Sequence, residues 1–221
     1  MNIALPFFSV ILGAALVLAG AAKSQKRLKL LLAFSGAFLL STTVTALLPE
    51  VFGHAETTIS YWILGGIVAQ LVLENLSKGA EHGHIHIHHS SKLPLALLIG
   101  LSLHAFIEGF PLHHHHELLW AIVVHKLPIA MLLTAALWRT KISLFAKFAT
   151  LIGFALMTPL GSYLNESVSC LQNYSVHITA LVVGVMLHIS TTILFESAEN
   201  HKFNTSKIVV ILFGLAFGAL L

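Results

Sequence analysis

The sequence predicts an all-α membrane protein with eight transmembrane helices, and three observations carry that prediction: an apolar composition, long apolar runs and an alternating placement of basic residues. Of the 221 residues, 57% are hydrophobic and only 10% are charged, and the mean hydropathy is +0.88. These values lie outside the usual range of soluble globular domains. Lipid rather than water is therefore the expected solvent.

The apolar runs define the expected helices. A bilayer core is roughly 30 Å thick and needs about 20 apolar residues per helical span, which leaves room for about eight spans with short connections. Because lipid offers the backbone no hydrogen-bond partner, each run is expected to be helical. We expect residues 1–221 to form a single polytopic domain, whose first run is retained as a span. The spans are predicted at residues 3–22, 30–49, 58–77, 93–112, 117–138, 144–164, 175–197 and 207–221.

The basic residues orient these spans. Of the 12 lysines and arginines, all but one fall in or beside the first, third, fifth and seventh connections. The positive-inside rule then places those connections in the cytoplasm and both termini outside. The net charge of +3 is thus a topology signal, and it does not indicate nucleic-acid binding. The residues concerned are Lys23, Lys26, Arg27, Lys29, Lys78, Lys92, Arg139, Lys141, Lys147, Lys202 and Lys207.

The remaining basic residue, Lys126, falls near the middle of the fifth predicted span. An unpaired ammonium at that depth costs roughly 2.5–3.5 kcal/mol on insertion scales. We therefore expect Lys126 to face the interior of the bundle and to have a partner there.

Histidine and carboxylate side chains on the fourth and fifth spans form the candidate metal site. His104 and Glu108 are four residues apart, so they share one helical face and can share one cation. Counted from the connection between the two spans, His104 and His125 both lie about 12 Å deep. The single cysteine, Cys170, excludes a thiolate cluster, and two imidazoles with a carboxylate suit zinc. The alternative is a set of buried polar residues that hydrogen-bond between helices.

These two spans resemble the paired fourth- and fifth-helix motifs of the ZIP (zinc- and iron-regulated-transporter-like) family. The first reads His104-Ala-Phe-Ile-Glu-Gly and the second His125-Lys-Leu-Pro. The resemblance covers essentially the whole chain, because the histidine-rich third connection and the external termini match as well. It implies transport of a divalent transition metal, zinc first and also iron, manganese or cadmium, into the cytoplasm. It also implies a homodimer without a catalytic cofactor, and assigns the ion to His104, Glu108 and His125.

The chain departs from the family pattern beside these ligands. Many members build a second, adjoining metal position where this sequence has Ala105 and Lys126, and the final glutamate of the fifth-helix motif is Ile129 here. An ammonium repels a second cation. We therefore predict a single transport site, in which Lys126 pairs with Glu108 when no metal is bound.

Polar residues on the second and seventh spans are predicted to line the pore or to support the site. The end of the second span resembles the family's pore-lining second helix. The resemblance implies that Thr45 lines the pore, with Ser41 one turn below it. The seventh span contributes His188 and Glu196, although His188 fits a hydrogen-bonded core position equally well. Both spans carry Ser-Thr-Thr and end in an acid. This predicts an inverted repeat around helices 4 and 5, with chance similarity as the alternative.

Histidine-rich connections on both sides are expected to act as auxiliary metal-binding segments. One is the cytoplasmic loop 78–92 and the other joins the fourth and fifth spans outside. Solvated loops without a function are the alternative. The histidines are His82, His84, His86, His88, His89, His113, His114, His115 and His116.

A transporter is favoured over an enzyme. An intramembrane zinc hydrolase or di-iron hydroxylase is the competing hypothesis, because three membrane histidines can also hold a catalytic metal. The chain has no HExxH helix and no repeated HxxxH or HxxHH boxes spread over several helix ends. The expected partners are divalent metal ions and the lipid bilayer, and the expected location is the bacterial inner (plasma) membrane.

Overall fold

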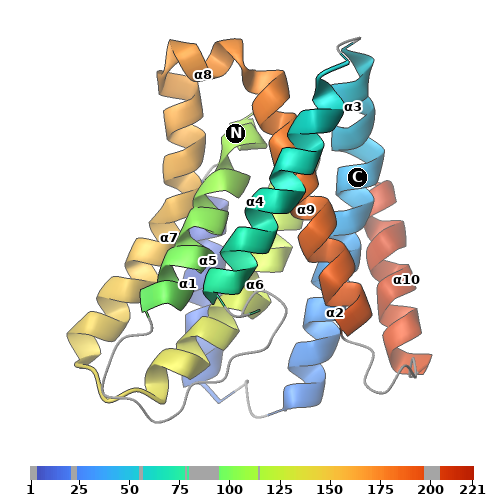
Figure 1. Cartoon of the computed structure of the whole chain (residues 1–221). Helices are drawn as coiled ribbons and strands as arrows, with labels where there is room; N and C mark the ends of the chain where they lie inside the picture. The colour runs from blue at the N-terminus through green and yellow to red at the C-terminus, as the bar shows by residue number, and fades with distance from the viewer. Residues whose placement is uncertain are drawn as a thin grey trace.

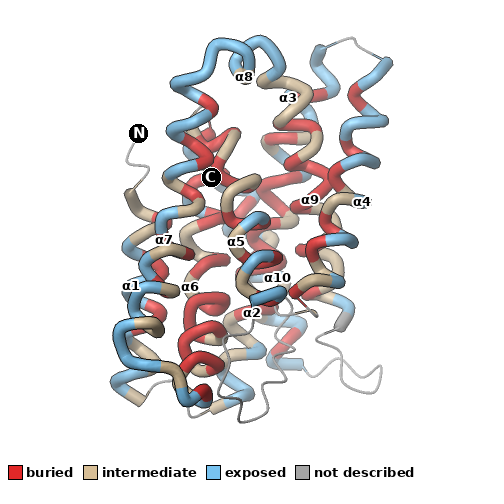
Figure 2. The backbone as a smooth tube through the Cα atoms, turned by 60° about the vertical axis from the view of Figure 1, so that its left-hand side comes forward, coloured by how far each residue is buried: buried red, intermediate tan, exposed pale blue. Residues whose placement is uncertain are grey.

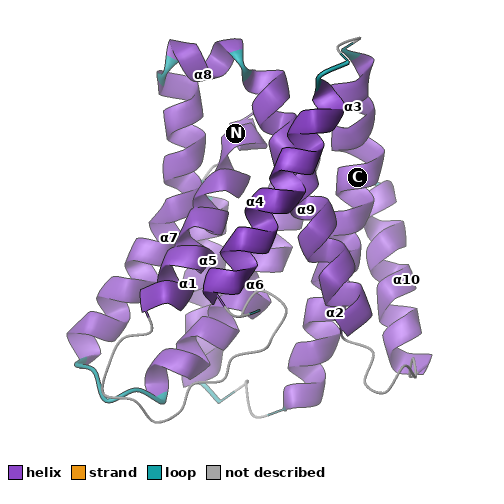
Figure 3. Cartoon of the chain, in the orientation of Figure 1, coloured by secondary structure: helices purple, strands orange, loops and turns teal. Residues whose placement is uncertain are grey.

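The structure is a computed structural model that describes residues 4–20, 24–54, 57–77, 79, 95–113, 115–196 and 205–221. Within these ranges the chain consists of helices joined by short loops, and no strand is present (Figure 3). The all-α prediction is confirmed for this part of the chain. The helices are α1 (Leu5–Leu18), α2 (Gln25–Thr42), α3 (Leu48–Gly53), α4 (Ile59–Ser77), α5 (Leu95–Gly109), α6 (His116–Trp138), α7 (Leu144–Ser167), α8 (Ser169–Asn173), α9 (Ser175–Glu196) and α10 (Thr205–Ala219), with a π-helical segment η2 (Thr43–Leu47) and a 3-10 turn η4 (Phe110–His113).

Six of the eight predicted spans contain helices that are long and apolar enough to cross a membrane, counted over the described residues. The other two, at either end of the chain, contain α1 and α10, which are apolar but have only 14 and 15 residues. That is fewer than the roughly 20 that a full crossing needs. The six long helices are Gln25–Gly53, Ile59–Ser77, Leu95–His113, His116–Trp138, Leu144–Ser167 and Ser175–Phe195.

The distribution of side chains is that of a protein surrounded by lipid. Large apolar side chains such as Phe8, Tyr61, Phe145 and Phe195 lie exposed on the outer faces of the helices. Serine, threonine, histidine and charged side chains are meanwhile buried inside. In water this arrangement would forgo the hydrophobic stabilisation that folds soluble proteins. It suggests that the described helices are embedded in a membrane.

Eight of the described helices form two groups of four. Among the six long helices, α6 is the most buried: 67% of its most apolar stretch lies inside the bundle, and Figure 2 shows it buried along most of its length. The closest helix pairs are α1 with α6, α5 with α7, α4 with α9, and α2 with α10. The first group is therefore α1, α5, α6 and α7, and the second is α2, α4, α9 and α10. They meet where α2 packs on α6 and α4 packs on α5.

Glycines bring two of these pairs into backbone contact. A Cβ added at Gly66 of α4 would overlap the carbonyl oxygen of Leu181 in α9, so only glycine permits this approach. In the same way, a Cβ added at Gly161 of α7 would overlap the carbonyl oxygen of Phe106 in α5. These contacts set the spacing of α4 against α9 and of α5 against α7, the helices that carry the polar clusters described below.

The basic residues gather at one end of the bundle. Figure 1 shows α3 and α8 at one end and the starts of α2, α7 and α10 at the other, while the end of α10 points toward the side of α3 and α8. The described basic residues other than Lys126 lie at or next to the starts of α2, α7 and α10. We call this end the basic end. Lys23, Lys78, Lys92 and Lys202 lie outside the described residues.

Candidate metal site

His104 and Glu108 lie on one face of α5, as their spacing predicts. The Nε2 atom of His104 is 3.3 Å from Oε2 of Glu108, and their side chains are 5% and 0% exposed. Two ligands of one tetrahedral zinc ion, each about 2.1 Å from the metal, are about 3.4 Å apart. The imidazole and the carboxylate are thus already separated by the distance that a shared zinc ion requires.

His125 of α6 faces this pair. The rings of His104 and His125 meet edge to face, with their centroids 6.2 Å apart, and His125 is buried. The structure therefore brings together the two histidines that the depth count placed at one level. Among the described residues, however, no three His, Cys, Asp or Glu side chains are close enough to hold one metal ion as they stand. The three candidate ligands are neighbours, and their side chains would have to move closer together to bind one ion.

Lys126 reaches the same carboxylate from α6. Its ammonium pairs with Oε1 of Glu108, and both side chains are almost completely buried. The ammonium also lies 4.8 Å from the ring centroid of Phe154, a position that favours a cation–π interaction. Each buried charge depends on the other, because removing either one would leave an uncompensated ion inside the bundle. The partner expected for Lys126 is therefore Glu108.

Thr158 of α7 completes the contacts of Glu108, and the sequence analysis missed it. Its hydroxyl lies 3.0 Å from Oε1 of Glu108 and 2.8 Å from the carbonyl oxygen of Ala105. A hydroxyl has one proton, so Thr158 can donate to one of these oxygens at a time. The only signal in the sequence is a polar residue next to Pro159 in an apolar run, which does not indicate the direction of the side chain.

One buried nitrogen of the cluster lacks a hydrogen-bond partner among the described residues, namely Nδ1 of His104. Leaving a buried polar atom unsatisfied costs roughly 1–3 kcal/mol. Such atoms are uncommon in folded proteins and often mark sites that bind water or ions. A water molecule beside the ring would satisfy this atom, whereas an ion shared with Oε2 of Glu108 would bind Nε2, the other ring nitrogen.

The two pore-lining candidates of the second span form hydrogen bonds to backbone carbonyls, and pore lining by them stays a prediction. The hydroxyl of Ser41 donates to the carbonyl oxygen of Leu215, 2.7 Å away, so Ser41 belongs to the contact between α2 and α10. Thr45 is exposed and donates to the carbonyl of Ser41 at 2.8 Å. The turn that carries Thr45 is the π-helical segment η2, whose extra residue per turn changes the face that each side chain occupies.

Two histidines of the connection between α5 and α6 pair with carboxylates from other helices. Nε2 of His113 lies 3.2 Å from Oε1 of Glu166, and Nδ1 of His115 lies 3.2 Å from Oε2 of Glu50. His116 packs against the ring of Trp120. The remaining loop candidates, His82, His84, His86, His88, His89 and His114, and the side chain of Glu196 lie outside what the structure describes.

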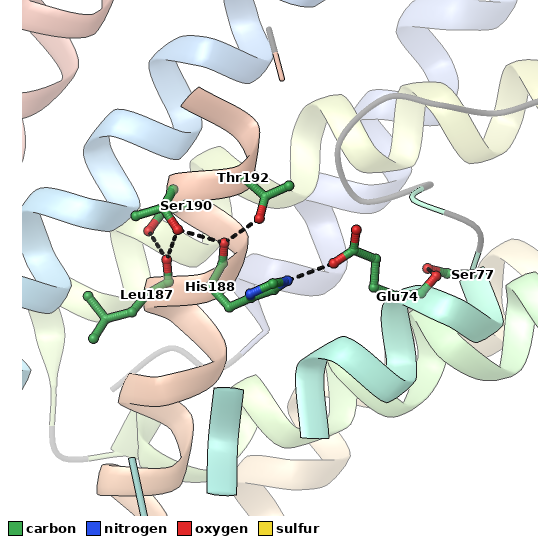
Figure 4. A network of polar contacts seen from close by, with 7 residues as sticks. Glu74, Ser77, Leu187, His188, Ser190 and Thr192 are labelled. Atoms are coloured by element: carbon green, nitrogen blue, oxygen red, sulfur yellow. Dashed lines mark hydrogen bonds and ion pairs between the residues drawn. The ribbon is translucent and has the colours of Figure 1, made fainter. Parts of the chain in front are cut away.

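His188 forms a hydrogen bond within the bundle. Its Nε2 atom is 2.6 Å from Oε2 of Glu74, which links α9 to α4 (Figure 4). The sequence analysis offered pore lining and a hydrogen-bonded position as alternatives for His188, and the second describes its observed contact. Glu74 was not named as its partner, because a single sequence does not show which helices pack together.

Comparison with known proteins adds no family assignment. No model of a known protein family matches the chain, and no curated protein matches it either. The similarity to the ZIP family therefore rests on the motifs that carry His104, Glu108 and His125, and membership of that family stays a prediction.

Proposed function

We propose that this chain transports divalent transition-metal cations, zinc most readily, across a membrane, with His104, Glu108 and His125 as its transport site. The observation that supports this most is the buried cluster itself. An imidazole and a carboxylate at the separation of two zinc ligands face a second imidazole from the most buried helix. Nitrogen and oxygen donors of this kind suit zinc and related borderline-soft ions.

We further propose that α1 and α10 also cross the bilayer, which makes eight spans with both termini outside. The gathering of basic residues at one end supports this topology, because cytoplasmic connections are rich in lysine and arginine. In this proposal the basic end faces the cytoplasm, and a bacterial inner membrane is the expected location. Transport into the cytoplasm follows from the resemblance to the ZIP family.

An inverted repeat is supported by the helix pairing. In this repeat α1 corresponds to α7, α2 to α9, α4 to α10 and α5 to α6. The α5–α7 pair then corresponds to the α6–α1 pair, and the α4–α9 pair to the α10–α2 pair. The Ser-Thr-Thr triplets of the second and seventh spans also fall on segments that correspond in this repeat. Thr42 donates to the carbonyl of Phe38, and Thr191 donates to the carbonyl of Leu187, both four residues back. Such repeats commonly place a transported ion at their interface.

Lys126 supplies the charge that the cation replaces. The ammonium neutralises Glu108 inside the bundle, so the pair is stable without a metal. A divalent cation bound to Glu108 repels the ammonium, which then leaves the carboxylate. Thr158 can follow by donating to the carbonyl of Ala105 instead of Oε1. Glu108 thus has a positive partner in both states.

Single alanine substitutions at His104, Glu108 and His125 test the transport site. We expect each to reduce zinc uptake by cells to near background while protein abundance in the membrane is retained, because each removes one ligand of the same ion. The matched control is His54→Ala, which removes an exposed histidine bonded only to a backbone carbonyl. Normal uptake by any two of the three site variants would contradict the assignment.

A further inference from the structure

Another imidazole–carboxylate pair, which we call the second pair, lies between α4 and α9. Nε2 of His188 is 2.6 Å from Oε2 of Glu74, and Figure 4 shows the ring of His188 pointing from α9 directly at the carboxylate. The two side chains are 17% and 24% exposed, whereas those of His104 and Glu108 are 5% and 0% exposed. The second pair therefore has the same donor atoms as the first but is open to its surroundings.

The turn of α4 that carries Glu74 packs against α5, the helix that carries His104 and Glu108. The contact lies at Gly100, where an added Cβ would lie only 3.0 Å from the backbone nitrogen of Ser77. Gly100 precedes His104 by four residues on α5, which is about 6 Å along the helix axis. Glu74 and His188 both lie in the second half of their helices, toward the basic end. Measured along α5, the turn that carries Glu74 therefore lies about one helical turn closer to the basic end than His104 does.

The backbone around both residues is fixed by hydroxyl groups. The carbonyl oxygen of His188 accepts hydrogen bonds from Thr191 and Thr192, at 3.0 and 2.9 Å. The carbonyl oxygen of Glu74 accepts from the hydroxyl of Ser77 at 3.2 Å. The helices therefore hold the two side chains at fixed starting points, and rotation of those side chains is the change that a bound ion would require.

The chemistry of the pair suits weak binding of a cation. The present 2.6 Å separation is that of a hydrogen bond, and opening it to the roughly 3.4 Å between two ligands of a tetrahedral ion takes less than about 1 Å. Among the described residues the pair supplies two ligands, and water can complete the coordination. A transport pathway needs such sites, because an ion must be able to leave each of them.

We propose that Glu74 and His188 form a second, weaker binding site for a divalent transition-metal cation, which receives the ion from the first site and releases it to water at the basic end. This inference rests on the proposed transport function for its role, but the binding itself can be measured without transport.

Co²⁺ binding to the purified full-length chain tests the proposal. The background variant has serine in place of His82, His84, His86, His88, His89 and Cys170, which removes the competing imidazoles of the loop 78–92 and the thiol. In this background, Glu74→Gln/His188→Gln keeps a hydrogen bond between α4 and α9 but lacks both ligands. We expect it to lose one weakly bound Co²⁺ per chain. His104→Ala/His125→Ala should lose the tightly bound ion and keep the weak one.

A spectroscopic readout distinguishes binding from a structural role. His188→Cys in the same background breaks the imidazole–carboxylate contact but retains a ligand for Co²⁺, and it should therefore show thiolate-to-Co²⁺ charge-transfer absorption. Adding Glu74→Gln to His188→Cys should lower the Co²⁺ affinity that is measured by titrating this absorption band. The matched control is His54→Ala, which removes an exposed histidine bonded to a backbone carbonyl and should leave Co²⁺ binding unchanged.

The results separate this inference from the proposed function. If the double glutamine variant binds as many Co²⁺ ions as the background, or if His188→Cys shows no charge-transfer band, the second site is refuted even where zinc uptake is normal. If the weak ion is lost as expected but the background transports no metal, the site stands and the proposed transport function fails. Uptake that is slowed in the double glutamine variant would support both.

Discussion

At the scale of single residues, Glu108 is the point on which the buried polar contacts converge. Oε2 faces His104, while Oε1 is shared by the ammonium of Lys126 and the hydroxyl of Thr158. These groups come from α5, α6 and α7, so one carboxylate ties together three helices of the first group. In the proposed cycle its partner alternates between Lys126 and the transported ion.

Replacing Lys126 should make the stability of the protein depend on metal. Lys126→Met leaves the buried carboxylate of Glu108 without its ammonium, which costs about 3–5 kcal/mol for a broken buried pair. Zinc should then raise the melting temperature of Lys126→Met far more than that of the parent, because a bound ion stabilises the folded state. Lys126→Glu adds an oxygen ligand and should increase the number of metal ions bound per chain.

The control for this prediction is Lys147→Met. Lys147 also lies over an aromatic ring, with its ammonium 5.3 Å from the centroid of Trp138, but it has no described carboxylate partner. It should respond to zinc as the parent does. Equal effects of zinc on the melting temperatures of the parent, Lys126→Met and Lys126→Glu, together with equal metal content, would contradict the role assigned to Lys126.

At the scale of helices, the two glycine contacts determine which polar side chains meet. The α5–α7 contact at Gly161 brings Thr158 within hydrogen-bond distance of Glu108. The α4–α9 contact at Gly66 joins the helices that carry Glu74 and His188. Because small residues allow backbones to approach in lipid, they act here as spacers for the chemistry.

Two adjacent glycines of α4 provide a test of this role. Gly66→Ala forces a Cβ against the carbonyl of Leu181, and overpacking of this kind costs typically 1–3 kcal/mol. Gly65→Ala meets nothing within 4 Å and should be neutral or slightly stabilising, because alanine favours helix. Thermal unfolding of both variants in the same detergent measures the difference. A lower melting temperature for Gly65→Ala than for Gly66→Ala would argue against the observed α4–α9 packing.

At the scale of the complete chain, apolar runs predicted which segments are helical, but they did not predict where the helices end or which helices pack together. Six predicted spans match membrane-length helices within a few residues, because hydropathy reports burial in lipid directly. The helix α2 begins at Gln25 rather than near residue 30, since its first turn is polar and starts at a Ser24 cap that accepts from the backbone nitrogen of Arg27. The short helix α8 was not predicted, because it lies in a polar connection between two apolar runs.

The candidate site was predictable where it depends on one helix or on two consecutive ones. Helical spacing pairs His104 with Glu108, and the short connection between α5 and α6 brings His125 level with them. Thr158 and Glu74 come from helices whose neighbours are decided by packing between distant segments, which a single sequence does not reveal. The π-helical turn before Pro49 likewise changes the face of α2 in a way that regular periodicity does not anticipate.

The most direct measurement is metal uptake by the purified chain in sealed proteoliposomes, with zinc, iron, manganese, cadmium and cobalt compared at equal concentration. The account predicts saturable accumulation that is greatest for zinc, and its loss when His104 and His125 are both replaced by alanine. Accumulation no greater than in empty liposomes for every ion, from protein that is folded and correctly inserted, would contradict the proposed function. Water-dependent product formation by that same protein would then favour the metalloenzyme alternative.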